Sequence, residues 1–176
     1  MHITENFTID KLKLTDANQL YQFMIDNYQR LLLFFPLTLS SNSSIEKTKE
    51  YISIKEKEIQ EKSNFTLAIR EKDSQNIAGL IIIKKIDWEK RIAELAYCIG
   101  SEYEGRGMVS FAVKGISKYS FDELELKTLH IISHKTNLGS VKVAQKCGFV
   151  WSETLKNEFT PTNGLPLDME LYELTR

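Results

Sequence analysis

Apolar residues along this chain recur with two different periods, one typical of strands and one typical of helices. Alternating or short continuous apolar runs, bounded by polar and turn residues, predict strands at Phe7–Leu12, Phe65–Ile69, Ile77–Lys84, Arg91–Ile99, Leu129–Ser133, Phe149–Leu155 and Leu165–Leu174. Apolar positions three and four apart predict helices that begin at Thr15 or Asp16, at Ser43, after Gly107 and at Asn137. Ser43 and Glu46 have the spacing of a capping box for a helix that reaches about Lys62. This order of elements is typical of a mixed α/β fold.

The spacing of the strands also indicates how they pair. Three strands follow one another between Phe65 and Ile99 with short turns between them, which favours an antiparallel meander. The helix after Gly107 then leads to the strand at Leu129–Ser133, and this crossover favours one parallel pair. With 176 residues, 42% apolar content and no repeat or linker, residues 1–176 are expected to form a single domain.

Two glycines stand where the strand that contains Ala93–Ile99 passes into a helix. Gly105 and Gly107 flank Arg106, and their lack of a Cβ lets backbone N–H groups approach an anion closely. The helix that begins at Met108 directs the positive end of its dipole to the same place. The junction therefore predicts a phosphate site and a phosphorylated cofactor, while a pair of loop glycines without a ligand is the alternative.

A second junction follows the strand at Leu129–Ser133. Asn137-Leu138-Gly139-Ser140 opens a helix that ends at Lys146-Cys147-Gly148-Phe149, where Gly148 suits the left-handed position after the helix. Asn137 is placed to cap this helix through its side-chain oxygen, a role that is compatible with ligand binding.

Composition excludes several classes of function. The 23 basic and 24 acidic residues give a net charge of −1, so no global basic field favours direct binding of RNA or DNA. Cys98 and Cys147 lie in a predicted strand and a predicted helix without metal-ligand spacing, and neither a disulfide nor a metal site is expected. We find no secretory signal and no run long enough to span a membrane, which favours a cytoplasmic enzyme.

The two junctions together resemble the GNAT superfamily of acetyl-CoA-dependent N-acetyltransferases. Glu102 to Gly107 is similar to the family's glycine turn, and Asn137, Ser140, Lys146, Gly148 and Phe149 are similar to its later signature. The segments Ala93–Tyr97 and Asn27–Leu31 make the chain most similar to the ribosomal-protein N-terminal (serine) acetyltransferases. Glu102 departs from the Gln or Arg common in the family, as Asp10 departs from a common Arg.

This resemblance implies a mainly antiparallel sheet whose central parallel strands splay apart, with helices on its flanks. The opening accepts the pantetheine arm of CoA, which pairs with strand backbone like a missing strand. The residues implied to bind acetyl-CoA are Tyr97, Cys98, Ile99, Gly105, Arg106, Gly107, Met108, Val109, Asn137, Lys142 and Lys146.

Direct transfer of acetyl to an amine requires a base, oxyanion donors and an acid for the departing thiolate. The resemblance implies Ser140 as the acid and Glu158 as the base, with Glu94 as the competing base. Each residue also has a non-catalytic interpretation: Ser140 as a serine in the first turn of a helix, Glu158 as a solvated loop carboxylate, and Glu94 as an acid with a structural role. No covalent intermediate is needed, which disfavours either cysteine as a nucleophile. We expect the acceptor to contact Asn27, Arg30, Phe34, Phe35 and Trp88. The alternative is that these residues only pack inside the fold.

Two other functions remain open at this point. Gly105-x-Gly107-x-x-Ser110 imitates part of a dinucleotide fingerprint, but the preceding meander disfavours a Rossmann oxidoreductase. A non-catalytic acyl-CoA-binding module is the alternative of another class. Among acceptors, the resemblance favours a protein N-terminal amine, with a polyamine or another small amine as the alternative, and relatives are often homodimers.

Overall fold

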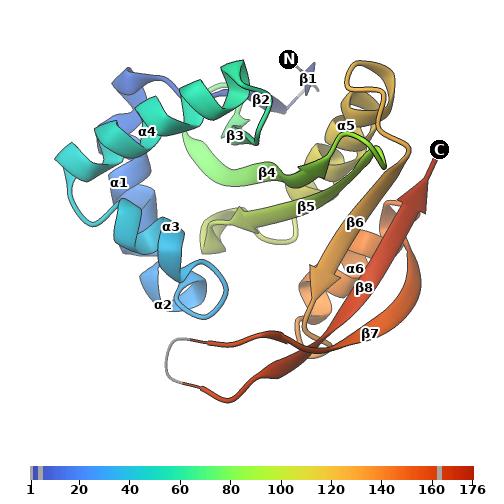
Figure 1. Cartoon of the computed structure of the whole chain (residues 1–176). Helices are drawn as coiled ribbons and strands as arrows, with labels where there is room; N and C mark the ends of the chain where they lie inside the picture. Colours follow the sequence, from blue (N-terminus) through green and yellow to red (C-terminus); the bar gives the residue numbers. More distant parts are fainter. Residues whose placement is uncertain (1, 4–5, 162–163) are drawn as a thin grey trace. The chain divides into compact units, whose positions relative to one another are not determined.

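The computed structural model describes residues 2–3, 6–161 and 164–176 of the chain (Figure 1). It consists of two compact units, one formed by Met1–Ile82 and Tyr97–Met108, the other by Ile83–Ala96 and Val109–Arg176. The chain passes between the units inside two strands, β4 (Ile77–Asp87) and β5 (Ile92–Ile99), and again at the start of α5 (Met108–Asp122).

The first unit combines one end of the sheet with the N-terminal helices. Its strands are ordered β1-β2-β3-β4-β5, and both β1–β2 and β2–β3 pair antiparallel. The elements wholly inside it are β1 (His2–Ile3), β2 (Phe7–Lys11), the 3₁₀ turn η1 (Leu14–Asp16), α1 (Ala17–Asp26), α2 (Tyr28–Leu31), α3 (Pro36–Ser41), α4 (Ile45–Gln60), β3 (Phe65–Glu71) and η2 (Ser101–Tyr103).

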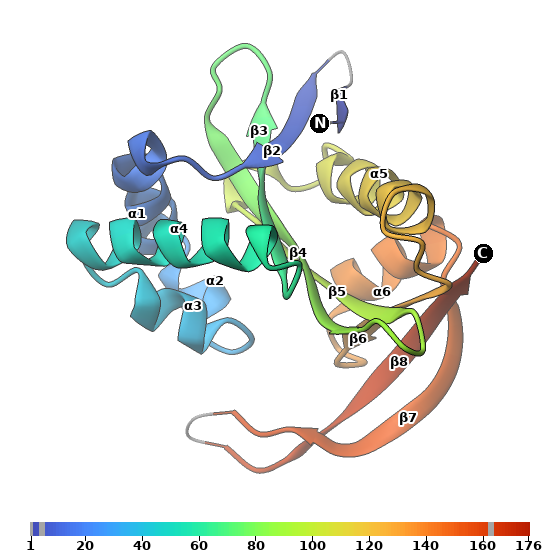
Figure 2. The ribbon, with the colours of Figure 1, turned by 45° about the horizontal axis from the view of Figure 1, so that its top comes forward.

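Apolar side chains from these helices pack on the strands. Helices α1 and α4 lie side by side (Figures 1 and 2). Leu20 and Met24 of α1 and Ile52 of α4 are at most 2% exposed and join Leu80 of β4 in one buried cluster. Helix α1 thus buries one apolar face, whereas Tyr28 lies beyond its end at Asp26 and is 48% exposed.

The second unit contains the parallel pair and the C-terminal strands. Its strand order is β4-β5-β6-β8-β7, in which β5–β6 is parallel while β6–β8 and β7–β8 are antiparallel. The remaining elements are β6 (Thr128–Ser133), α6 (Leu138–Lys146), β7 (Val150–Phe159) and β8 (Leu167–Thr175). Strands β7 and β8 run together as a ribbon in Figure 2. The predicted mixed α/β class with a mainly antiparallel sheet and flanking helices is confirmed.

Two predicted details are wrong. Ser44, not Ser43, caps α4, because its side-chain oxygen accepts the hydrogen bond from the Lys47 N–H and no Ser43–Glu46 box forms. Helix α3 was not expected, although Pro36 at its first position has the fixed φ that suits a helix start.

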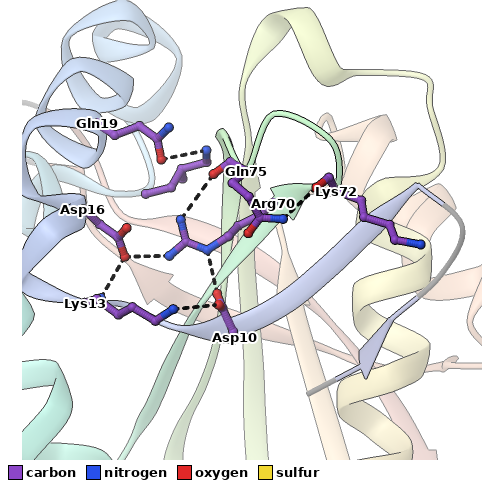
Figure 3. A network of polar contacts seen from close by, with 8 residues as sticks. Asp10, Lys13, Asp16, Gln19, Arg70, Lys72 and Gln75 are labelled. Atoms are coloured by element: carbon purple, nitrogen blue, oxygen red, sulfur yellow. Dashed lines mark hydrogen bonds and ion pairs between the residues drawn. The ribbon is translucent and has the colours of Figure 1, made fainter.

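A buried arginine ties together β2, η1 and β3 (Figure 3). Arg70 is 4% exposed, its Nε lies 2.6 Å from Asp10 Oδ1, and its Nη2 lies 2.6 Å from Asp16 Oδ2. Burial acts to lower the pKa of Arg70, but the hydrogen bonds that Arg70 donates to Asp10 and Asp16, with the charges of these carboxylates, outweigh burial and raise that pKa. Asp10 therefore has a structural role as the partner of Arg70.

Replacing Arg70 with Met should destabilise the fold by about 3 kcal/mol, because two largely buried carboxylates then lose their cation. The matched control is Lys13→Met. Lys13 Nζ is 3.8 Å from Asp10 and its side chain is 66% exposed, so its loss should change little. Urea denaturation measures both, and equal effects of the two substitutions would contradict the assigned role of Arg70.

Candidate active site

The strand β5 begins the candidate site. Its parallel register with β6 joins Ile92 to Thr128, Ala93 to Leu129 and Glu94 to His130, and it ends there. The remainder of β5, with Tyr97, Cys98 and Ile99, belongs to the first unit. On the β4 side, a Cβ at Gly79 would collide with the carbonyl oxygen of Cys98. Glycine at position 79 is thus required for β4 to approach the strand expected to bind pantetheine.

The turn between β5 and α5 has the backbone that its glycines predict. Gly105 and Gly107 have φ of 73° and 76°, a left-handed conformation that other residues adopt only with strain. Apart from the residues directly before and after each glycine, a Cβ at either position would meet no atom within 4 Å, so no other part of the chain crowds these two positions. Helix α5 begins at once with Met108 and continues with Val109. A helix N-terminus behind such a turn presents backbone N–H groups that can bind an anion.

Side-chain contacts hold this turn within the first unit. The backbone N–H of Ser101 donates to Asn27 Oδ1 at 3.1 Å, and the guanidinium of Arg30 binds the carboxylate of Glu104. Arg106 lies over the ring of Tyr103, 5.3 Å from its centroid, with Nη1 3.4 Å from Glu71 Oε1. Asn27 and Arg30, expected at the acceptor, therefore contact the segment that contains the glycine turn. Glu71 and Glu104 were not singled out from the sequence.

The second junction is built as a capped helix. Asn137 Oδ1 accepts the N–H of Ser140 at 3.2 Å, and Gly148 has φ of 88° directly after α6, so both local predictions are confirmed. Ser140 thus lies in the first turn of α6. Lys142 and Lys146, four residues apart on this helix, are exposed. Cofactor contacts of these residues stay predictions.

Glu158 lies on a strand rather than in the predicted loop. Strand β7 continues to Phe159, and its register against β8 shifts between Leu155 and Phe159. Asn157 inside this bulge has φ of 54°, and its N–H donates to Asp168 Oδ1 at 3.0 Å. Lys156 Nζ contacts the other oxygen of Asp168 at 2.7 Å. The Lys156 hydrogen bond and then the Asn157 N–H lower the pKa of Asp168, which keeps this clamp ionised. The bulge fixes how Glu158 is presented.

Glu94 and Glu158 are joined through one lysine in the second unit. Glu94, 7% exposed, contacts Lys84 Nζ at 2.8 Å through Oε1 and Lys85 Nζ at 3.0 Å through Oε2. Lys85 Nζ also lies 3.6 Å from Glu158 Oε1. Desolvation acts to lower the pKa of Lys85, but the bond to Glu94 and both carboxylate charges outweigh it and raise that pKa. Neither lysine was singled out from the sequence.

The remaining acceptor candidates are distributed over both units. Phe34 and Phe35 are half-buried after α2, and Phe35 packs against the buried cluster of the first unit. Trp88 follows β4 in the second unit and is 43% exposed. Of these three, Trp88 offers the largest exposed ring fraction to a ligand.

The cysteines have the properties of structural residues. Cys98 is 7% exposed, and burial raises the pKa of its thiol to about 12 although a backbone hydrogen bond at Leu80 opposes the shift. Burial also raises the pKa of Cys147, whose Sγ contacts the Ser110 carbonyl oxygen at 3.3 Å. A neutral thiol is a poor nucleophile.

The described residues contain neither a cluster of metal ligands nor a helix suited to span a membrane. Within 2–3, 6–161 and 164–176, no three His, Cys, Asp or Glu side chains gather as a metal site would require. In the same ranges, no helix combines the length and the apolar character that crossing a bilayer requires.

Comparison with known proteins places this geometry in a family. Residues 6–150 match the acetyltransferase (GNAT) domain. YdaF of Bacillus subtilis (strain 168), named as a candidate ribosomal N-acetyltransferase, is 29% identical over 176 residues, which cover 99% of this chain and 93% of YdaF. Spermidine N(1)-acetyltransferase of Escherichia coli (strain K12) is 34% identical over 82 residues, which cover 47% of this chain and 44% of that enzyme.

A solved structure has the same fold. The microcin C7 self-immunity acetyltransferase MccE, solved with acetyl-CoA and AMP, superposes with a TM-score of 0.87 over 98% of this chain and 94% of that one, at 21% identity. The chain belongs to the GNAT acetyltransferase family, and it is an N-acetyltransferase that uses acetyl-CoA.

Proposed function

We propose that this enzyme transfers acetyl from acetyl-CoA to the N-terminal α-amine of a ribosomal or other protein. The observation that carries this proposal is the extent of the similarity to YdaF, which covers 99% of this chain and 93% of that protein. The similarity to the Escherichia coli spermidine enzyme covers less than half of either chain. It therefore supports the shared acetyltransferase chemistry more than a shared acceptor.

The charges around the two candidate bases also favour an acceptor with a single amine. Lys84 and Lys85 offset Glu94 and Glu158, so these four side chains carry no net charge. A polyamine carries several positive charges and is best bound by an excess of carboxylates. A protein N-terminus brings only one amine to the reaction, which suits a neutral cluster.

The cofactor is assigned to the glycine turn and to the strand before it. The backbone N–H groups of Gly105–Val109, at the start of a 15-residue helix, would bind the diphosphate. Backbone groups of Tyr97, Cys98 and Ile99 would pair with the pantetheine amides, and Asn137 would contact the same arm. Lys142 and Lys146 would attract the adenosine phosphates.

Glu158 is the better candidate for the base. Both oxygens of Glu94 are within 3.0 Å of lysine ammonium groups, and its side chain is only 9% exposed. Glu158 has one longer contact, 3.6 Å, and its side chain is 36% exposed. It can therefore accept a proton from the incoming ammonium, directly or through a water molecule. Glu94 in this assignment holds Lys84 and Lys85 in place.

Ser140 completes the proposed chemistry as the acid. When the amine nitrogen bonds to the thioester carbonyl carbon and the carbon–sulfur bond breaks, the departing thiolate needs a proton. The hydroxyl of Ser140, in the first turn of α6 that the Asn137 cap fixes, would supply it. The nitrogen loses a second proton as the amide forms, and this proton would restore the Ser140 hydroxyl through water, while Glu158 keeps the proton taken from the ammonium. The thioester donates the acetyl group, and no cysteine of this chain has to carry it.

Replacing Gly107 with Ala should weaken acetyl-CoA binding. An L-residue at this left-handed φ is strained by about 1–2 kcal/mol, which raises Kd roughly fivefold to thirtyfold if the strain falls on the bound turn. Gly148→Ala is the control, because φ at Gly148 is also positive but this residue ends α6. Calorimetric titration measures both. The turn is not the phosphate site if the two variants bind acetyl-CoA equally well.

Replacing Glu158 with Gln should lower kcat roughly a hundredfold at neutral pH, with the Kd of acetyl-CoA nearly unchanged. The loss should shrink at high pH, because the acceptor amine is then already neutral. Glu94→Gln is the comparison in steady-state assays over a range of pH. A normal pH–rate profile for Glu158→Gln would remove Glu158 from the base role.

The acceptor itself is tested with purified enzyme and acetyl-CoA, by mass spectrometry of the products. Peptides with the N-terminal sequences of ribosomal proteins should gain one acetyl group at the α-amine, with a kcat/KM well above that for spermidine. The same peptides with blocked α-amines are the control. A higher kcat/KM for spermidine would contradict the proposed acceptor, but the assignment of the family and of acetyl-CoA would stand.

A further inference from the structure

The glycine turn carries more negative than positive side chains. From Ser101 to Gly107 the charged residues are Glu102, Glu104 and Arg106, a net charge of −1. Arg106 is partly offset by Glu71, whose Oε1 lies 3.4 Å from its Nη1. The diphosphate of acetyl-CoA is itself an anion, and like charges a few ångströms apart repel. Acids in this turn therefore oppose the ligand that its backbone is suited to bind.

Arg30 supplies the missing cation from a distant part of the sequence. Its guanidinium binds the carboxylate of Glu104, which is 74 positions away and immediately precedes Gly105. A guanidinium paired with a carboxylate leaves no net charge on the two side chains. The pair is partly exposed, with side-chain exposures of 42% for Arg30 and 52% for Glu104, so its contribution to folding stability is small.

A second contact, made by Asn27, fixes the helix that carries Arg30 against the start of the turn. Asn27 is 6% exposed, its Nδ2 donates to the Phe23 carbonyl at 2.9 Å, and its Oδ1 accepts the N–H of Ser101 at 3.1 Å. Arg30 follows three residues later in α2, so the start of this helix is fixed against the start of the turn. Both amide functions of Asn27 are used inside the fold.

We propose that Arg30 is a positioning residue of the cofactor site, and that it acts through Glu104. By neutralising this carboxylate and holding it, Arg30 lets the diphosphate approach the N–H groups of the turn. This assigns Arg30 to acetyl-CoA rather than to the acceptor. The inference rests on the proposed phosphate site at Gly105–Val109.

The experiment is a double-mutant cycle on acetyl-CoA binding, measured by calorimetry in low salt. Arg30→Ala should raise Kd roughly threefold to tenfold, since a free carboxylate then faces the diphosphate through water. Glu104→Gln should bind as tightly as the parent or more tightly. The double variant should bind like Glu104→Gln, because Arg30 has nothing left to neutralise. Added salt should reduce the penalty of Arg30→Ala.

Matched controls separate this effect from a general loss of structure. The penalty should persist in a Glu102→Gln background, which removes a neighbouring acid of the same turn. It should disappear with S-acetyl-pantetheine, which lacks the phosphates. The proposal is overturned if Arg30→Ala weakens binding equally with and without Glu104, or if it changes only the KM of the acceptor.

A separate outcome would identify failure of the underlying site. If the parent enzyme binds acetyl-CoA and Gly107→Ala leaves this affinity unchanged, the turn is not the phosphate site and the role of Arg30 falls with it. If Gly107→Ala weakens binding while Arg30→Ala does not, the phosphate site stands and only the role of Arg30 is overturned.

Discussion

The left-handed backbone at Gly105 and Gly107 is the constraint on which the candidate site depends. The chain leaves β5 and must start α5 within a few residues, and two positive φ angles accomplish this change of direction. A Cβ would meet no crowding at either position, so conformation rather than space selects glycine there. The same backbone leaves N–H groups unpaired by helix geometry at the start of α5, as a phosphate requires.

Such a turn needs support because its glycines add conformational freedom. Most of the support comes from side chains far away in sequence, because Asn27 binds the Ser101 N–H, Arg30 binds Glu104, and Glu71 contacts Arg106. Within the turn itself, Arg106 also packs on the ring of Tyr103. Each contact fixes a different residue of the turn. Charged side chains therefore mainly hold the turn in its conformation, while the backbone N–H groups at the start of α5 provide the partial positive charge. This division explains how the turn can contain Glu102 and Glu104 and still suit an anion.

In the second unit, charged side chains likewise hold the proposed catalytic residues in place. Glu158 follows two bulge residues, Lys156 and Asn157, that the two carboxylate oxygens of Asp168 hold in place. Lys85 links Glu158 to the buried Glu94. A bulge changes the direction of one side chain without breaking the ribbon of β7 and β8. Because Lys84 and Lys85 balance the two acids, the cluster has no excess charge to attract a polycation. Acceptor preference can thus depend on charge balance as well as on shape.

Whether a feature could be predicted from the sequence depends on how far apart in sequence the interacting residues are. The left-handed conformation of Gly148 and the Asn137 cap are local, and the sequence predicted both. For Gly105 and Gly107 the sequence predicted a turn open to an anion, and the structure adds their positive φ angles. The α4 cap was misplaced by one residue because Ser43 and Ser44 offer the same hydroxyl, and only the folded backbone distinguishes them. Arg30 and Glu104 are 74 positions apart, and nothing near either residue indicates the other. An ion pair across such a distance depends on the finished fold, so a resemblance between motifs transfers backbone functions more safely than side-chain functions.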